Sequence, residues 1–128
     1  MPTIRHIVDI DAEIDAVWSK IADTSNISGL IGFLADSEQT GDTRVCTLAD
    51  GAKLTEKIVS VEPELKRVLY AITDSPLGMD FHAATMELSE RPGGTRLIWN
   101  VDILPESAVA NMAPMLDAAA ADMRQSLA

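Results

Sequence analysis

The sequence has few of the residues from which many kinds of functional site are built. Cys46 is the only cysteine, so the chain forms no internal disulfide. With two histidines it also has no closely spaced set of ligands for a structural zinc ion. Lysine and arginine number 10 against 20 acidic residues, and the net charge of −10 argues against nucleic acid or an anionic membrane as the partner.

Other common signals are missing as well. No apolar run approaches the roughly 20 residues of a membrane span, and the first residues, Met1 to His6, lack the basic and apolar regions of a signal peptide. The sequence contains no glycine-rich phosphate loop, no nucleophile elbow and no internal repeat. We therefore expect a cytoplasmic protein without membrane insertion, metal or cofactor, whose function depends on the shape of its fold.

The spacing of the apolar residues predicts a strand, two short helices and then a series of strands. Thr3–Asp11 alternates apolar and polar residues as a strand does. Asp11 is placed to cap a helix whose apolar face runs from Ile14 to Ile21, and Thr24–Gly32 suits a second short helix or a loop. Turn signals then separate further predicted strands, near Phe33–Gln39, Thr43–Leu48, Ala52–Val61, Arg67–Thr73, Met79–Ser89 and Thr95–Leu104.

After Pro105 the composition changes to alanine and methionine. Apolar residues recur three or four positions apart from Val109 to Leu127, which predicts one long helix, and Pro114 should kink this helix or delay its start. An antiparallel sheet followed by a long helix is an α+β arrangement, in which a twisted sheet curls around the helix and leaves a cavity between them. At 128 residues the chain is expected to form one domain, residues 1–128.

Several stretches together carry a resemblance to a known superfamily. They are IDAEIDAVWSKIAD near the start, GDTRVCTLADGAKLTEKI in the middle, and YAITDSPL, AATMEL and GTRLIWNVDILP toward the end of the sheet. In this order and spacing they resemble the START-type helix-grip superfamily (SRPBCC), the fold of the birch pollen allergen, and within it the polyketide cyclase/dehydrase family of small bacterial proteins. The resemblance covers nearly the whole chain. It implies a curved antiparallel sheet of about seven strands wrapped around the long C-terminal helix, with two short helices after the first strand.

The resemblance also implies a hydrophobic pocket for lipids, sterols, polyketides or molecules similar to plant hormones, although only some members of the family are enzymes. Two positions depart from the family pattern. The segment Ile27–Phe33 lacks the tryptophan and, apart from Phe33 at its end, the other aromatic residues often found after the first helix, and His82 stands where a tyrosine is common. Both positions border the expected cavity, so the departures concern the ligand rather than the fold.

The turn Ala49–Gly51 allows two registers for the hairpin that it joins. A two-residue turn turns Arg44 away from Glu56, whereas a three-residue turn with Gly51 in the left-handed region pairs the two residues. We favour the second register because relatives often have proline at the position of Ala49, and proline suits the first central position of a type I turn. Arg44 and Glu56 then share the apolar inner face, where each charge needs a partner, and in the family a glutamate at this position commonly lines the pocket. The alternative is a partly solvated cross-strand pair.

Alternation along the other strands predicts which side chains face inward. The candidate ligand-binding residues lie on this inner surface and on the long helix: Arg44, Glu56, Tyr70, His82, Met86, Trp99, Met112 and Leu116. His6 also points inward but is more simply structural. For His82 two interpretations stay open, packing with a hydrogen-bond partner or orientation of a ligand, and Tyr70 and Trp99 are equally explained as core residues. No residue is assigned a catalytic role.

Three functions are compatible with these residues, in order of preference. The first is a carrier or sensor that binds a small hydrophobic molecule. The second is an enzyme of the polyketide cyclase/aromatase or dehydratase type, which would use the same pocket for aldol cyclisation and loss of water. The third uses the fold as a chaperone or interaction surface without a ligand. We expect the cavity to open near Leu48–Ala52 and Asp74–Met79, whose counterparts in related hormone receptors resemble a gate and a latch, and we expect a monomer or homodimer.

Overall fold

The computed structural model describes residues 2–128, and Met1, the first residue of the expected domain, lies outside them. The strands form one antiparallel sheet in the order β1-β7-β6-β5-β4-β3-β2. Their bounds are β1 Thr3–Ile10, β2 Leu34–Thr40, β3 Thr43–Leu48, β4 Lys53–Glu62, β5 Arg67–Asp74, β6 Phe81–Arg91 and β7 Gly94–Leu104. Every predicted strand is confirmed, and the short turns between them explain why sequential strands are neighbours in the sheet.

Helices precede and follow the series of hairpins. The α-helix α1 (Ile14–Ala22) and the 3₁₀ helix η1 (Thr24–Gly29) connect β1 to β2, so the second short helix is confirmed. After β7 a short 3₁₀ turn, η2 (Glu106–Ala108), leads into the long helix α2 (Val109–Ser126). This helix begins before Pro114 and continues beyond it, so the proline does not delay its start.

The predicted cap of α1 is wrong. The helix begins at Ile14 with Glu13 at the N-cap position, and no side chain caps it. Asp11 lies in a bend between β1 and the helix. The bend is tied to the sheet because the hydroxyl of Thr95 donates to the carbonyl oxygen of Ala12 at 2.8 Å. The connection between β1 and α1 is therefore longer than the sequence pattern predicted.

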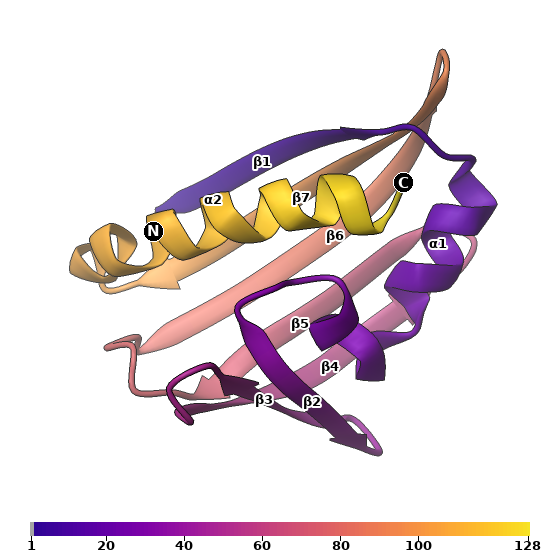
Figure 1. Ribbon diagram of the computed structural model, residues 1–128. Coiled ribbons are helices and arrows are strands. Elements are labelled where there is room, and N and C mark those ends of the chain that lie inside the picture. The colour runs from indigo at the N-terminus through magenta and orange to yellow at the C-terminus, as the bar shows by residue number, and fades with distance from the viewer. Residues whose placement is uncertain (1) are drawn as a thin grey trace.

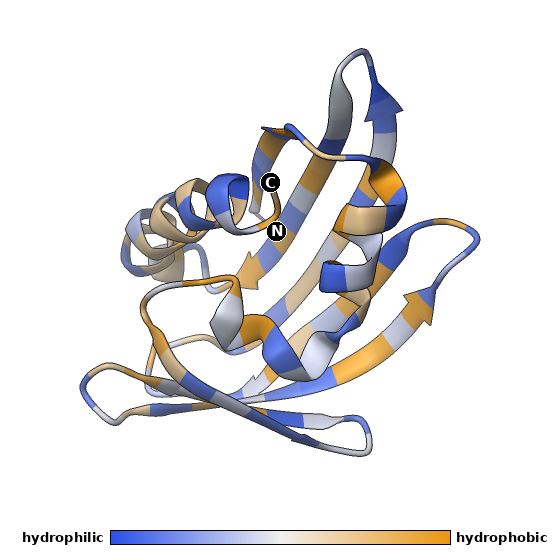
Figure 2. Cartoon of the chain, turned by 45° about the vertical axis from the view of Figure 1, so that its right-hand side comes forward, coloured by the Kyte–Doolittle hydropathy of each residue, from blue (hydrophilic) through white to orange (hydrophobic). Residues whose placement is uncertain are grey.

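The sheet is curved, and α2 lies across its concave face while α1 and η1 lie at one end (Figure 1). Register shifts in the β2–β3 and β4–β5 pairs bend the strands on one side of the sheet. Apolar and polar residues alternate along the strands, as their colours show in Figure 2, so one face of the sheet is apolar and packs against the helix. Trp99, Leu97, Ile103, Met123 and Val101 are among the largest side chains buried there.

The hairpin between β3 and β4 has the register that the three-residue turn predicts. Arg44 pairs with Glu56 and Cys46 pairs with Leu54. Gly51 has a φ of +89°, which is the left-handed conformation that this turn requires. The inner face of the hairpin therefore carries one basic and one acidic side chain among apolar neighbours. Within residues 2–128 there is no helix that is both long and apolar enough to cross a membrane.

Candidate functional site

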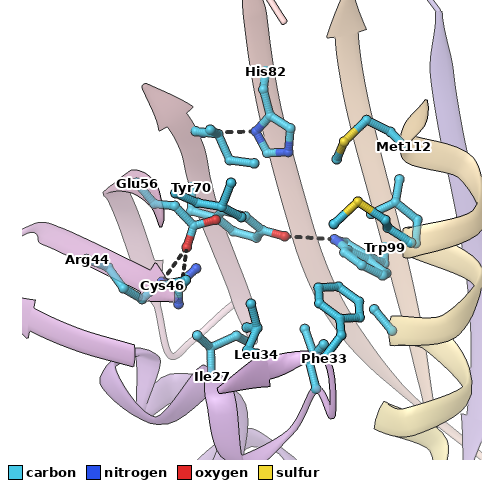
Figure 3. A pocket seen from close by; sticks show the side chains of 16 residues that line it. Ile27, Phe33, Leu34, Arg44, Cys46, Glu56, Tyr70, His82, Trp99 and Met112 are labelled. Carbon is cyan, nitrogen blue, oxygen red and sulfur yellow. Dashed lines mark hydrogen bonds and ion pairs between the residues drawn. The ribbon is translucent and has the colours of Figure 1, made fainter. Parts of the chain in front are cut away.

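A cavity lies between the sheet and α2, where the sequence predicted one (Figure 3). Its polar lining consists of Arg44, Cys46, Glu56, Tyr70, His82 and Trp99. The remaining lining is apolar and comes from η1 and the segment after it, from the strands and from α2: Ile27, Ile31, Phe33, Leu34, Leu54, Ile72, Met112, Met115, Leu116 and Ala119. Apolar walls with a few polar groups are the usual composition of a small-molecule site.

The cavity is small. Its volume is about 50 Å³. One water molecule needs roughly 10–15 Å³ of such volume, so the space has room for a few waters. A larger ligand therefore requires lining side chains to move outward.

Arg44 and Glu56 form the predicted ion pair inside this cavity. Nε of Arg44 donates to Oε1 of Glu56 at 2.7 Å, and the two side chains are 3% and 7% exposed. Nη1 of Arg44 also donates to the carbonyl oxygen of Thr24 at 2.8 Å, which ties η1 to the sheet. The guanidinium carbon lies 5.1 Å from the centre of the Tyr70 ring, a favourable position for a cation over an aromatic face. The pair is therefore buried and not a solvated pair on the surface.

Cys46 is held by the same carboxylate. Its Sγ lies 3.3 Å from Oε1 of Glu56 and donates to it. Burial and, next, the charge of Glu56 raise the pKa of the Cys46 thiol to about 12. The thiol consequently stays protonated at neutral pH and is a hydrogen-bond donor rather than a nucleophile.

Tyr70 and Trp99 are joined across the floor of the cavity. Nε1 of Trp99 donates to the hydroxyl oxygen of Tyr70 at 3.2 Å. Burial raises the pKa of the Tyr70 hydroxyl, so the group remains a neutral phenol. As an acceptor from the indole, the hydroxyl keeps its own proton for a further partner.

His82 fills a place where β5 and β6 separate. The pairing of these strands ends at Tyr70 and Ala84, although both strands continue. The backbone N–H of Ile72 donates instead to Nδ1 of His82 at 3.0 Å. This bond requires Nδ1 to be unprotonated, so the neutral imidazole carries its proton on Nε2. Burial lowers the pKa of His82 to about 4, which keeps the ring neutral at neutral pH.

Three polar atoms of residues that line the cavity have no partner in the protein. Oε2 of Glu56, Nε2 of His82 and Nη2 of Arg44 make no hydrogen bond, yet among residues 2–128 the only fully buried side-chain nitrogen or oxygen without a partner is Nδ1 of His6. These three atoms are therefore not fully buried, and they belong to side chains that line the cavity. Figure 3 shows Glu56, Tyr70, His82 and Trp99 around the same space.

The structure brings together seven of the predicted site residues and excludes one. The seven that line the cavity are Arg44, Glu56, Tyr70, His82, Trp99, Met112 and Leu116. Met86 is buried on the same face but does not line the cavity, because it lies farther along β6, opposite Trp99 in the sheet. His6 does not line it either, and its Nε2 lies 2.8 Å from a carboxylate oxygen of Asp117 on α2.

The segment Ile27–Phe33, which the resemblance placed at the border of the cavity, lines it with Ile27, Ile31 and Phe33, and Leu34 follows, although none of these side chains was predicted as ligand-binding. Its position depends on contacts between distant parts of the chain. Oδ2 of Asp122 on α2 accepts from the backbone N–H of Gly32 at 2.7 Å. The sequence showed only that isoleucine and leucine recur within this segment rich in serine and glycine, which does not say which of them face inward.

A shallow apolar hollow adjoins the cavity on the outside. Its lining consists of Phe33, Leu48, Ala49, Asp50, Pro114, Met115 and Ala118. Phe33 and Met115 line both spaces, so they separate the cavity from this outer hollow. The expected opening near Leu48–Ala52 is therefore in contact with the hollow, whereas no residue of Asp74–Met79 lines either space.

Another open hollow lies at the start of α1. It is lined mainly by charged residues, among them Asp11, Glu13, Asp15, Glu90 and Arg91. Nowhere in the described part of the chain do three or more histidine, cysteine or carboxylate side chains gather as metal ligands would.

A curved antiparallel sheet that holds a long C-terminal helix over a cavity defines a helix-grip protein of the START type. Residues 1–128 match the family described as "Polyketide cyclase / dehydrase and lipid transport", and the chain belongs to this family. None of the curated proteins matches the chain.

Solved structures with low sequence identity share the fold. XoxI from Bacillus cereus has a TM-score of 0.90 at 16% identity, over 99% of this chain and 96% of that one. A START superfamily protein from Mycobacterium smegmatis has a TM-score of 0.79 at 10% identity, over 98% and 96% of the two chains. Norcoclaurine synthase from Thalictrum flavum has a TM-score of 0.74 at 16% identity, over 97% and 84%. At these identities the likeness concerns the fold alone.

Proposed function

We propose that residues 1–128 form one ligand-binding domain that holds a small hydrophobic molecule in the cavity under α2. The observation that carries this proposal is the set of polar atoms without a protein partner, Oε2 of Glu56, Nε2 of His82 and Nη2 of Arg44, on side chains that line an apolar cavity. These atoms are not sealed off, so a ligand or water in the cavity can pair with them, and their placement among apolar walls is best explained by such a partner. The membership of the family described as polyketide cyclase / dehydrase and lipid transport supports the same function.

The proposed ligand-binding residues fall into two groups. Arg44, Glu56, Tyr70 and His82 supply polar contacts, while Trp99, Met112 and Leu116 supply apolar surface. In this proposal His82 donates from Nε2 to an oxygen of the ligand, because its Nδ1 is already occupied by the backbone of Ile72.

Admission of a ligand requires one wall to move, and the structure favours the wall on the side of α2. The wall from η1 is fixed by the bond between Arg44 and the Thr24 carbonyl. Met115 and Phe33, in contrast, separate the cavity from the outer hollow, and methionine side chains repack easily. Pro114 removes one hydrogen bond from the turn of α2 beside Met115. We therefore propose that the ligand enters between Phe33 and Met115.

Catalysis by the same pocket is less well supported. Cyclisation and loss of water need a group that takes up and returns a proton. His82 is poorly suited to this task, because Nδ1 already accepts a hydrogen bond and Nε2 already carries the proton. Its pKa of about 4 also makes it a weak base. Binding is therefore the function that the geometry supports best.

The proposal is tested by filling the cavity. Ala119 lines the cavity and is buried, whereas Ala121 lies on the exposed side of the same helix. Ala119→Leu should weaken binding of acetophenone, a compact probe, by at least about tenfold, while Ala121→Leu should leave it unchanged. Amide NMR spectra report both the dissociation constant and whether each variant is folded. Equal binding by both variants, or no binding by the unmodified protein, would show that the cavity is not the ligand site.

A further inference from the structure

The charges inside the cavity already neutralise one another. The guanidinium of Arg44 is paired with the carboxylate of Glu56 at 2.7 Å, and both side chains are almost fully buried. His82 adds no charge, because burial lowers its pKa to about 4. The remaining titratable side chains of the lining, Cys46 and Tyr70, are a protonated thiol and a protonated phenol. At neutral pH the lining therefore has no net charge.

A charged ligand would enter this site without a counter-charge. A carboxylate placed beside Oε2 of Glu56 would meet a like charge. Nε and Nη1 of Arg44 already donate to Glu56 and to the carbonyl of Thr24, and although its Nη2 has no partner, the positive charge of the guanidinium is already balanced by Glu56. An unpaired charge in an apolar enclosure is strongly unfavourable. An uncharged ligand avoids this cost.

Hydrogen-bond donors outnumber acceptors among the groups that remain available. Nε2–H of His82 and Nη2 of Arg44 have no partner, and the hydroxyl of Tyr70 accepts from Trp99 and so keeps its proton available. Against these three donors stands one acceptor, Oε2 of Glu56. A carbonyl oxygen accepts two hydrogen bonds and carries no charge. It is therefore the simplest group that satisfies these donors.

Resting on the binding function proposed above, we propose that this cavity selects uncharged ligands with a carbonyl oxygen directed at His82 and Tyr70, and that it excludes carboxylates. The ion pair of Arg44 and Glu56 then determines which ligands bind, in addition to stabilising the fold. Free fatty acids and aromatic acids are excluded as ionised molecules, whereas ketones, aldehydes and amides of similar shape are accepted.

Three probes of nearly identical shape test the proposal. They are acetophenone, which has a neutral carbonyl, benzoate, which has a carboxylate in its place, and α-methylstyrene, which has an apolar methylene in place of the oxygen. Each is titrated into the unmodified protein at about pH 7.5, and amide NMR shifts around Ile72 and Trp99 report binding in the cavity. Acetophenone should bind at least about tenfold more tightly than benzoate, equivalent to about 1.4 kcal/mol.

Two further measurements identify the groups responsible. In His82→Phe, the preference for acetophenone over α-methylstyrene should fall about three- to tenfold, because the ring shape is kept and the Nε2 donor is lost. In Glu56→Gln, the ratio of benzoate affinity to acetophenone affinity should rise at least about tenfold, because Arg44 then has no counter-charge. Each variant is compared by ratios, so a general change in cavity shape cancels.

The pH dependence of the unmodified protein gives an independent test if a variant does not fold. Only neutral benzoic acid should bind, so the apparent affinity of benzoate should rise about tenfold for each unit by which pH is lowered from about 8 to about 6. Acetophenone affinity should stay constant over the same range.

The outcomes separate this selectivity from binding itself. If benzoate binds the unmodified protein as tightly as acetophenone, and does so independently of pH, the selectivity is wrong while binding in the cavity stands. If acetophenone and α-methylstyrene both leave the amides around the cavity unshifted, the proposed binding function fails and the selectivity with it.

Discussion

Replacing Glu56 by leucine should damage the protein more than replacing the whole ion pair. In Glu56→Leu, Nε of Arg44 loses an acceptor at 2.7 Å and Sγ of Cys46 loses one at 3.3 Å. Arg44 is only 3% exposed, so bulk water does little to replace the lost partner. Leaving a buried charge without its partner costs about 3–5 kcal/mol, and we expect the free energy of unfolding to fall by that amount.

The double variant Arg44→Met with Glu56→Leu leaves no charge unpaired. Its main loss is the donor to the carbonyl oxygen of Thr24, which costs about 1–3 kcal/mol. Apolar side chains in place of a buried ion pair recover part of this cost. The double variant should therefore be more stable than Glu56→Leu alone, with a coupling energy of at least about 3 kcal/mol between the two sites.

Urea unfolding followed by circular dichroism, applied to the two single variants and the double variant, measures this coupling. The slope of each transition should stay constant, which shows that the same surface is exposed on unfolding. Additive effects of the two substitutions would refute the reasoning, since they would mean that the two charges do not stabilise one another inside the cavity.

The other predictions concern the remaining polar groups. Because burial raises the pKa of Cys46 to about 12, iodoacetamide should modify its thiol only when the protein unfolds; fast labelling of the folded protein, seen by mass spectrometry, would contradict this. The pKa of His82 is lowered from 6.5 to about 4, so the unfolded chain binds more protons in this range and stability should fall as pH is lowered from about 6.5 toward 4. His82→Phe should reduce this slope in urea unfolding; an unchanged slope would mean that His82 is not buried as a neutral ring. Asp122→Ala should speed hydrogen exchange of the Gly32 amide about tenfold, and exchange at the original rate would show that their bond at 2.7 Å does not hold the cavity wall.

The register of the β3–β4 hairpin illustrates what local sequence can predict. Gly51 adopts the left-handed conformation that a three-residue turn requires, and this turn alone decides that Arg44 faces Glu56. Alternation on the other strands likewise placed Tyr70, His82 and Trp99 on the inner face. Side-chain direction follows from strand periodicity, so these features are local.

The features that the sequence did not predict depend on contacts between distant segments. The resemblance placed Ile27–Phe33 at the border of the cavity, but the positions of Ile31 and Phe33 in its wall depend on the bond between Gly32 and Asp122 on the last helix. Met86 faces inward as predicted. Alternation predicts which face of the sheet a side chain lies on, but it does not predict where along β6 the cavity lies.

The local role of His82 was also beyond the sequence pattern. The strand pattern indicates a continuous pairing of β5 and β6, yet the pairing ends at Tyr70 and Ala84. Beyond that point the backbone N–H of Ile72 donates to Nδ1 of His82 and not to a backbone carbonyl oxygen of β6. This arrangement depends on the divergence of two strands, which the curvature of the whole sheet determines.

The central claim is that a small hydrophobic molecule occupies the cavity under α2 in the organism that makes this protein. Native mass spectrometry of the protein purified from that organism tests it most directly, with Ala119→Leu and Ala121→Leu produced and purified in the same way. We predict a non-covalent small molecule on the unmodified protein and on Ala121→Leu, and its loss from Ala119→Leu, because Ala119 lines the cavity and Ala121 does not. Unmodified protein without any bound molecule, or equal occupancy of the two variants, would contradict the account.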